Sequence, residues 1–293
     1  YQSGMTAFYL GRHSIALSFF EQVISLQPDY AEAHHQRANA LVLLGRMKEA
    51  TEGYRRAILF NDAHAEAHNN LGCALQETFC FEQAIFAHEA AIRVSPQLVS
   101  AYYNLANALM KTGRLDEALD RYEAAIRIDL DYDFLLGAYL HLKMKICSWS
   151  NFHLDVQLLI NKVKQKHKVV SVFALLALVD SLPLHRMASE IWIASKYPEN
   201  IVLGKIPKKA TNTKIRLGYF SADFHNHATT WLMAELFERH DRTRFELFAF
   251  SFGPEIQDEM RQRVSNAFDH FIDIRQQSDL EVAQLARSLG IDI

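Results

Sequence analysis

Small and aromatic residues recur at a fixed interval of 34 positions through the first half of the chain. The sequence AEAH at residues 31–34 returns at residues 65–68, and VSAY takes the same place at residues 99–102. Within each interval an alanine precedes a ring-bearing residue by four positions: Ala16 and Phe20, Ala50 and Tyr54, Ala84 and His88, Ala118 and Tyr122. Small residues let two helices approach closely, while the ring fills the space beside them. The pattern predicts paired antiparallel helices, repeated along residues 1–132.

The first helix of each pair is expected to end at a turn in the left-handed backbone conformation. Gly11, Gly45 and Gly113 occupy this position, which favours glycine, and Phe79 takes it in the third repeat. The spacing resembles the tetratricopeptide repeat (TPR) as one partial and three complete copies. A TPR array forms a right-handed superhelix, an α-solenoid, whose concave face binds extended peptides.

Carboxamide side chains occupy two equivalent offsets of this repeat. Gln36, Asn70 and Asn104 share one offset, and Asn39 and Asn107 share the other. A carboxamide both donates to and accepts from a peptide backbone, so these side chains are predicted to bind an acceptor peptide. The alternative is that they bond the neighbouring repeat.

Residues 133–213 are predicted to form a capping helix and a helical connector. The segment 133–145 continues the helical period and is expected to cover the apolar face of the last repeat. Further helices are expected over residues 151–168 and 186–196, with a buried segment at residues 172–182. Residues 198–213 contain two prolines and clustered lysines, Lys205, Lys208 and Lys209, and are predicted to be an exposed linker.

Residues 214–293 alternate short apolar runs with helical patterns. Strands are predicted at 215–220, 245–250, 271–274 and from 291, and helices at 229–240, 255–268 and 279–289. Such alternation implies a parallel sheet with right-handed crossovers, and hence an incomplete Rossmann-like α/β lobe.

The loop after the first strand of this lobe is the main candidate for chemistry, because functional residues of such sheets gather where strands end and helices begin. Asp223, Asn226 and His227 lie there, just before a helix N-terminus. An imidazole can move a proton near neutral pH, which suits a general base, and the helix N-terminus favours an anion. Asp223, His225 and His227 have no matching further ligand, so no metal is expected. A plain helix-capping loop remains the alternative.

Composition excludes several classes of protein. The chain is 49% hydrophobic and 22% charged, which rules out a disordered chain. A net charge of −3 gives no overall basic field for nucleic acid or anionic lipid, and no apolar run is long enough to span a membrane. Three cysteines and the lack of a signal peptide indicate a cytoplasmic protein, and Tyr1 in place of methionine predicts a missing N-terminus.

Residues 215–227 (IRLGYFSADFHNH) resemble the opening of the catalytic region of the O-GlcNAc transferase and SPINDLY family, glycosyltransferase family 41. Residues 244–251 (RFELFAFS) and 268–273 (FDHFID) resemble the next blocks of that region. Residues 147–149 (CSW) are similar to a Cys-Asp-Trp that precedes it in bacterial members. The resemblance covers essentially the whole chain.

The resemblance implies a GT-B arrangement of two Rossmann-like lobes and transfer of N-acetylglucosamine from UDP-GlcNAc to Ser or Thr of proteins, with inversion. It implies no metal and no cofactor beyond the donor. His227 matches the family histidine proposed as catalytic base or acceptor-site residue, and Asp223 and Asn226 match residues expected to shape the loop. Two departures concern preference for donor or acceptor: His225 replaces the usual glycine and Ala228 the usual proline.

The expected parent is a bacterial-type protein O-GlcNAc transferase whose TPRs present acceptor proteins. The family's nucleotide-sugar site lies mainly in the second lobe, so these 293 residues are not expected to turn over alone. Two alternatives stay open: a SPINDLY-type O-fucosyltransferase using GDP-fucose, and a non-catalytic TPR peptide-binding scaffold. Structural roles are expected for His68, Cys73, Cys80 and His88.

Overall fold

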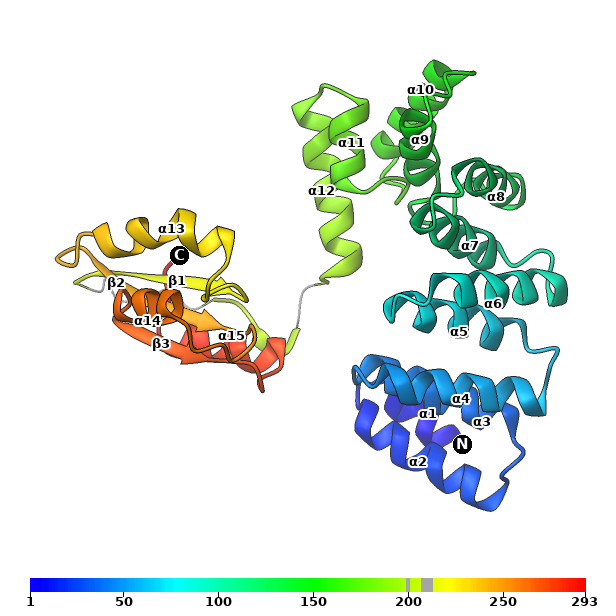
Figure 1. The fold of residues 1–293 in the computed structure, drawn as a ribbon, viewed down its shortest axis with the longest axis horizontal. Coiled ribbons are helices and arrows are strands. Elements are labelled where there is room, and N and C mark those ends of the chain that lie inside the picture. The colour runs from blue at the N-terminus through cyan, green and yellow to red at the C-terminus, as the bar shows by residue number, and fades with distance from the viewer. Residues whose placement is uncertain (199–200, 207–212) are drawn as a thin grey trace. The chain divides into compact units, whose positions relative to one another are not determined.

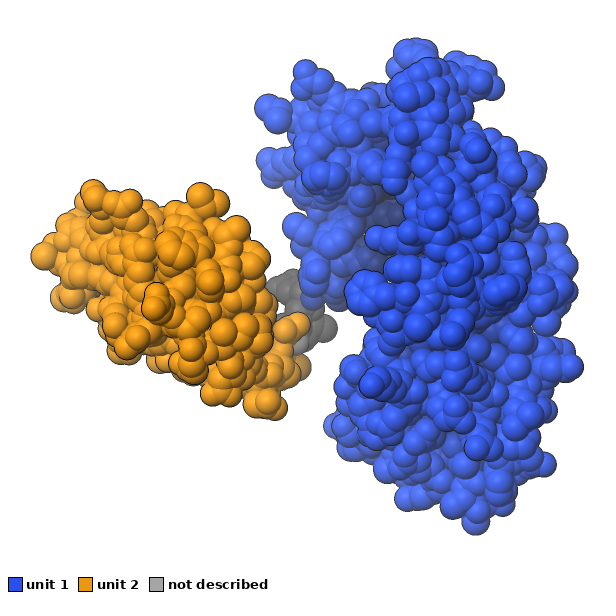
Figure 2. Space-filling view, viewed as in Figure 1, with its two compact units in different colours: residues 1–198 blue, residues 199–293 orange. Residues whose placement is uncertain are grey.

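A computed structural model describes residues 1–198, 201–206 and 213–293 (Figure 1). The chain divides into two compact units, residues 1–198 and residues 199–293, which Figure 2 distinguishes by colour. The predicted linker lies partly outside the described residues, including Lys208 and Lys209. Each unit is described by itself below.

The first unit begins with helices stacked as successive antiparallel pairs (Figure 1). Their bounds are α1 Gln2–Tyr9, α2 His13–Leu26, α3 Ala31–Leu43, α4 Met47–Phe60, α5 Ala65–Glu77, α6 Phe81–Val94, α7 Val99–Lys111 and α8 Leu115–Ile128. The predicted TPR array is therefore confirmed.

The turn and core positions of the repeat behave as the sequence predicts. Gly11, Gly45 and Gly113 have φ angles of 72°, 73° and 80°, and Phe79 has the same left-handed backbone at 61°. The ring-bearing positions Phe20, Tyr54, His88 and Tyr122 are at most 2% exposed. Each ring therefore fills the space between paired helices.

Four helices follow in the same unit: α9 Leu135–Lys145, α10 Phe152–Lys164, α11 Val172–Leu178 and α12 Leu182–Lys196. The helix predicted over 151–168 ends earlier, because Lys166 takes a left-handed φ of 64°. The prediction of a buried segment at 172–182 is wrong over much of its length, since Phe173 and Leu182 are each 81% exposed. Only one face of α11 packs inward, through Ala174 and Leu175.

The second unit contains the predicted α/β region. Its elements are η1 Ile201–Leu203, β1 Ile215–Ser221, α13 Ala228–Arg239, β2 Phe245–Ser251, α14 Glu259–Asn266, β3 His270–Asp273 and α15 Asp279–Ser288. The three strands are parallel in the order β1-β2-β3, with Ile215 opposite Phe245 and Phe248 opposite His270. Helix α14 begins four residues later than expected, because Asp258 caps its N-terminus.

The predicted fourth strand is not a strand in the structure, although its backbone does reach the sheet. The amide of Asp292 donates to the carbonyl of Arg216, and the amide of Gly218 donates to the carbonyl of Ile293, both at 2.8 Å. These hydrogen bonds are too few to make residues 291–293 a strand. They place residues 291–293 at the side of β1 away from β2.

Alternate residues of β2 build two cores on opposite faces of the sheet. Leu247 and Ala249 pack with residues of α13 and α14, whereas Phe248 and Phe250 pack with residues of α15. The period of two in the strand thus anchors helices on both faces, as a Rossmann-like lobe requires. None of the helices in the described ranges is long and apolar enough to cross a membrane.

Candidate functional site

The candidate catalytic loop connects the carboxyl end of β1 to the N-terminus of α13. Burial of Phe224, which is 2% exposed, fixes the middle of the loop to the core below. The residues around it, Asp223, Asn226 and His227, face outward and are partly or largely exposed. The sequence therefore places polar groups at the strand-to-helix junction while one aromatic ring anchors them.

His227 is the N-cap residue of α13, and 45% of its side chain is exposed. Its Nδ1 accepts a hydrogen bond from the amide of Thr229 at 3.2 Å and lies 3.6 Å from Oδ2 of Asp223. The second distance is too long for a direct hydrogen bond. Because Nδ1 accepts the hydrogen bond from Thr229, a neutral His227 has its proton on Nε2.

Asp223 is held by its backbone rather than by its carboxylate. Its amide donates to Oγ of Ser221 at 2.9 Å, and its carbonyl accepts from the amide of His225 at 2.7 Å. The same carbonyl accepts from the hydroxyl of the buried Thr230. The Asp223 backbone is therefore fixed, and its carboxylate lies 3.6 Å from Nδ1 of His227.

Asn226 links the loop to two neighbouring elements. Its side-chain Oδ1 accepts from Nε1 of Trp231 at 2.7 Å, and its amide donates to Oδ2 of Asp258 at 2.8 Å. These two residues border, with Asn226, a cavity of about 260 Å³. Asn226 thus joins the loop to α13 and to the cap of α14, and the indole of Trp231 that it binds is 60% exposed.

Two residues that sequence reasoning missed hold the loop from the next helix. Asp258 caps α14 by accepting from the amide of Arg261 at 2.7 Å, and the amide bonds to its carboxylate lower its pKa. The Arg261 guanidinium donates to Oγ of Ser251 at 2.8 Å and to the carbonyl of Phe224 at 3.2 Å. Asp258 lies inside the helix predicted over residues 255–268, and the preference of aspartate for the N-cap position was the signal that could have moved the start of that helix. Nothing in the sequence pointed to Arg261.

A glycine allows the loop after β2 to pass against this loop. A Cβ atom at Gly253 would lie 1.7 Å from the carbonyl oxygen of Ala222. Only glycine permits this approach of two backbones.

His225 and Ala228, the two departures from the family pattern, flank the candidate base. The His225 and His227 rings are 5.9 Å apart in an edge-on arrangement, and His225 acts on the Asp258 carboxylate by charge. Ala228 is the first residue of α13, a position that also accepts proline because its amide has no partner within the helix. His225 therefore adds a second imidazole to the face of the loop.

The carboxamides of the repeats lie along neighbouring first helices and bond to one another. Asn70 donates to Oδ1 of Asn39 at 3.2 Å, and Asn39 donates to Oε1 of Gln36 at 3.1 Å. Asn39 also accepts from the hydroxyl of Tyr54 at 2.7 Å. Asn39, Asn70 and Tyr54 border a cavity of about 490 Å³ between repeats.

The next repeats continue this row with different partners. Asn104 donates to Oδ1 of Asn69 at 3.2 Å and to Sγ of Cys73 at 3.3 Å. Asn107 accepts from the hydroxyl of Tyr122 at 2.6 Å and borders a cavity of about 250 Å³. These carboxamides thus join adjacent helices and are also partly exposed.

Comparisons with known proteins find two kinds of family along the chain. The model of the family described as "Glycosyl transferase family 41" matches residues 146–293. Two tetratricopeptide repeat models match residues 1–68 and 99–132.

Two curated relatives match parts of the chain. The SEC protein of Arabidopsis thaliana, described as a probable UDP-N-acetylglucosamine–peptide N-acetylglucosaminyltransferase, is 32% identical over 80 residues, which make up 27% of this chain and 8% of that protein. The UDP-N-acetylglucosamine–peptide N-acetylglucosaminyltransferase of Caenorhabditis elegans is 29% identical over 154 residues, or 45% of this chain and 13% of that protein. The matched segments are thus small parts of both relatives.

Two solved structures with TM-scores above 0.5, PilF and MamA, share the repeat fold at low identity. PilF of Pseudomonas aeruginosa is 19% identical with a TM-score of 0.54, covering 68% of this chain and 91% of that one. MamA of Desulfovibrio magneticus is 16% identical with a TM-score of 0.52, covering 56% and 93%. An O-GlcNAc transferase of Thermobaculum terrenum is 20% identical with a TM-score of 0.48, covering 90% of this chain and 45% of that one.

Proposed function

The chain belongs to glycosyl transferase family 41, and we propose that it serves as part of a protein O-GlcNAc transferase. The proposed reaction transfers N-acetylglucosamine from UDP-GlcNAc to Ser or Thr of acceptor proteins in the cytoplasm. One observation supports this proposal: the same chain contains a TPR array and the family 41 loop, whose histidine is the N-cap residue of a helix.

His227 is the proposed general base. An inverting transfer needs a group that takes the proton from the acceptor hydroxyl as its oxygen attacks the anomeric carbon. Nε2 of His227 can do this only when the ring proton is on Nδ1. Asp223, whose Oδ2 lies 3.6 Å away, favours that tautomer once a small ring rotation closes the distance. The Thr229 amide favours the opposite tautomer.

The N-terminus of helix α13 also favours negative charge at the proposed site. This N-terminus lies directly after His227, and unsatisfied amides at a helix N-terminus favour negative charge. The carboxylate of Asp223 and any anionic part of a donor would share this field. Asn226 holds the loop in place through its bonds to α13 and to the cap of α14.

The TPR carboxamides are the proposed acceptor-binding groups. Each carboxamide has two donors and an acceptor with two lone pairs, so the bonds described above leave part of its capacity available. Asn39 and Asn70 border the larger of the two cavities described above for the repeat carboxamides. A peptide backbone bound there would be gripped with little side-chain selectivity.

The test compares donors and variants in the gene product that contains this chain. Purified protein is assayed with labelled UDP-GlcNAc and, in parallel, with GDP-fucose, using a protein extract and mass spectrometry of the products. We expect GlcNAc on Ser or Thr, and loss of transfer by a factor of about 100 or more in His227→Ala. His153→Ala, an exposed histidine of α10, is the matched control.

The outcomes separate the alternatives. Transfer of fucose instead of GlcNAc would identify a SPINDLY-type enzyme. Unchanged transfer by His227→Ala would remove this residue from the mechanism. Peptide binding without transfer from either donor would make the protein a TPR scaffold and overturn the proposed function.

A further inference from the structure

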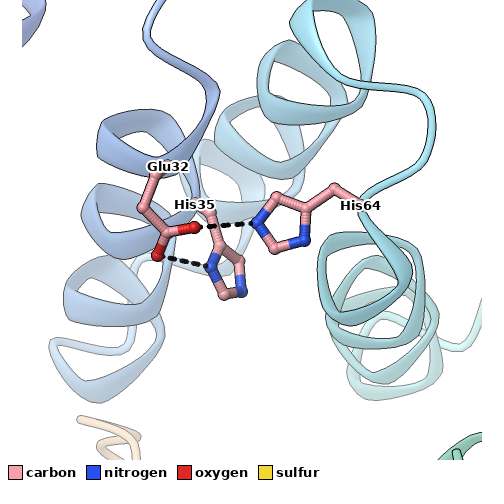
Figure 3. Close-up of side chains that lie close together, drawn as sticks. All are labelled: Glu32, His35 and His64. Atoms are coloured by element: carbon pink, nitrogen blue, oxygen red, sulfur yellow. Dashed lines mark hydrogen bonds and ion pairs between the residues drawn. The ribbon is translucent and has the colours of Figure 1, made fainter.

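Glu32, His35 and His64 form a cluster of metal-ligand side chains within the TPR array, in contact with the carboxamides Gln36 and Asn70 (Figure 3). Glu32 and His35 lie one turn apart on α3, and His64 is the N-cap residue of α5 in the next repeat. One potential ligand atom from each residue lies within 4.8 Å of the others. The cluster therefore joins two consecutive repeats.

The carboxylate faces both imidazoles, with one oxygen directed at each (Figure 3). Oε2 of Glu32 is 3.1 Å from Nε2 of His64, and Oε1 is 3.6 Å from Nδ1 of His35. A tetrahedral zinc with bonds of about 2.0–2.1 Å spaces its ligand atoms about 3.3 Å apart. The edge from Oε2 of Glu32 to Nε2 of His64 already has nearly this length, and Nδ1 of His35 lies within 4.8 Å of the other two ligand atoms.

His35 supplies the observation that points to a ligand. The residue is only 2% exposed, and its Nδ1 is buried without a hydrogen-bond partner. That atom is directed at Glu32 (Figure 3). A buried polar atom left unpaired is costly, and a metal ion bound between Nδ1 and the carboxylate would satisfy it.

The surroundings provide support for the ligands and a route of entry. Gln36 donates to Oε1 of Glu32 at 2.8 Å, and the hydroxyl of Tyr1 donates to the same atom at 3.2 Å. Such bonds orient a ligating carboxylate and leave its other oxygen, Oε2, for the metal. The Glu32 side chain is 36% exposed, so the site opens to solvent on that side.

From this geometry we propose that Glu32, His35 and His64 bind one Zn²⁺ ion, which pins α3 to the start of α5 in the following repeat. Two imidazoles and one carboxylate are a zinc ligand set, with a fourth position left for water. The set does not recur in the array, because the equivalent positions one repeat later are Glu66, Asn69 and Leu98.

Binding requires a change of tautomer at both histidines but no net loss of protons. The proton of His35 moves from Nδ1 to Nε2. In the metal-free structure the Asn70 carboxamide donates a hydrogen bond to Nε2 at 3.1 Å. Once Nε2 carries the proton, the Asn70 amide turns by half a turn, so that its oxygen accepts a hydrogen bond from Nε2. The proton of His64 moves from Nε2 to Nδ1, which ends the bond that Nδ1 accepts from the Ala67 amide at 3.3 Å. The half turn of Asn70 also ends the bond that it donates to Oδ1 of Asn39 at 3.2 Å, and the metal displaces the proton between His64 and Oε2 of Glu32. Three metal bonds therefore replace three hydrogen bonds.

The test titrates the 293-residue chain, freed of metal, with Zn²⁺ alone in competition with a chromogenic chelator. We expect one zinc per chain from this site. His64→Leu and His35→Asn introduce residues that the next repeat has at these positions, and each is expected to weaken binding at least about tenfold. His68→Asn, on the same helix α5, is the matched control and should bind as the unaltered chain does. Equal binding by all four proteins, or no binding by the unaltered chain, would overturn the proposal.

A spectroscopic measurement keeps the proposal testable if the buried His35 variant fails to fold. X-ray absorption of the zinc-loaded, unaltered chain should show nitrogen and oxygen ligands with imidazole scattering. Sulfur in the coordination shell would assign the zinc to the cysteines instead and would overturn the site.

Discussion

His88 occupies the core position that holds an aromatic ring in the other repeats, and it changes the chemistry of that position. Tyr54 and Tyr122 donate to an asparagine one helix away. In the third repeat Cys73 stands where that asparagine would be, so His88 bonds instead to Oδ1 of Asn69 through Nδ1 and to the Gln76 amide through Nε2. Both ring nitrogens are thus satisfied by a neutral imidazole, with Nδ1 the donor.

The array should therefore lose stability in mild acid through this one residue. Burial lowers the pKa of His88 from 6.5 to about 4. Between these values the unfolded chain binds a proton that the folded chain does not, so the stability is complete above pH 6.5 and falls as the pH is lowered toward 4. We expect a loss of about 2 kcal/mol in the free energy of unfolding between pH 7 and pH 5 from His88.

Urea unfolding at the two pH values measures this loss. The double variant His88→Tyr with Cys73→Asn restores the pair found in the other repeats and should remove the loss, whereas Cys73→Asn alone should keep it. An equal pH dependence in the double variant and the unaltered chain would show that His88 does not cause it.

Asp223 is the residue on which the proposed base function of His227 depends. An amide at this position cannot favour the proton on Nδ1 as a carboxylate does, so Asp223→Asn should lower kcat about tenfold or more in the active gene product. The rate should also change its dependence on pH, which a purely structural effect would not alter. Asp180→Asn, at an exposed position, serves as control. Unchanged kcat would mean that the 3.6 Å approach of Asp223 to His227 has no catalytic role.

At the scale of elements, the turn between α5 and α6 is the one TPR turn with a side chain on a left-handed backbone. Phe79 has φ of 61° where Gly11, Gly45 and Gly113 stand in the other repeats. The Phe79 ring adds little packing energy, since it is 80% exposed, with an edge-on contact to Phe81.

Phe79→Gly should therefore raise the free energy of unfolding by about 0.5–1 kcal/mol. The variant removes the strain of the left-handed backbone. This gain exceeds two losses, the ring contact with Phe81 and the larger conformational entropy that glycine gives the unfolded chain. Urea midpoints of the unaltered chain and the variant measure the difference. Gly113→Phe is the reverse substitution in the next repeat and should destabilise. A lower midpoint for Phe79→Gly would contradict the assignment of strain to this turn.

The sequence predicted the elements well wherever a period was repeated. The helices of the TPRs follow from alanines and rings that return four times, and β1 and β2 follow from short apolar runs. The prediction failed at residues 172–182, because an apolar run does not reveal which face packs; Phe173 is exposed although Leu175 is buried. Arg261 and His64 belong to no repeated pattern, so the sequence did not predict their contacts. The fold places Arg261 against the candidate loop and His64 against Glu32.

The hydrophobic cores of the molecule follow its division into units. The clusters around Tyr54, Tyr122 and Leu159 draw on residues of 1–198, and those around Phe237 and Phe250 draw on residues of 217–291. Within the first unit the last TPR pair and α9 share one cluster, and α9 shares the next cluster with α10, α11 and α12. Cooperativity is therefore expected to run along the helices from α1 to α12.

A fragment of residues 1–198 should accordingly fold with the stability that this unit has in the whole chain. Its apolar clusters are all retained, so we expect helical circular dichroism and an unfolding temperature within about 5 °C of the helical transition in the 293-residue chain. A second fragment ending at residue 132 removes α9 and should melt lower, because Leu135 and Leu142 then no longer cover the cluster around Tyr122. If both fragments melted alike, the helices after α8 would not act as a cap. If the longer one were unfolded, the repeats would depend on residues 199–293 for their stability.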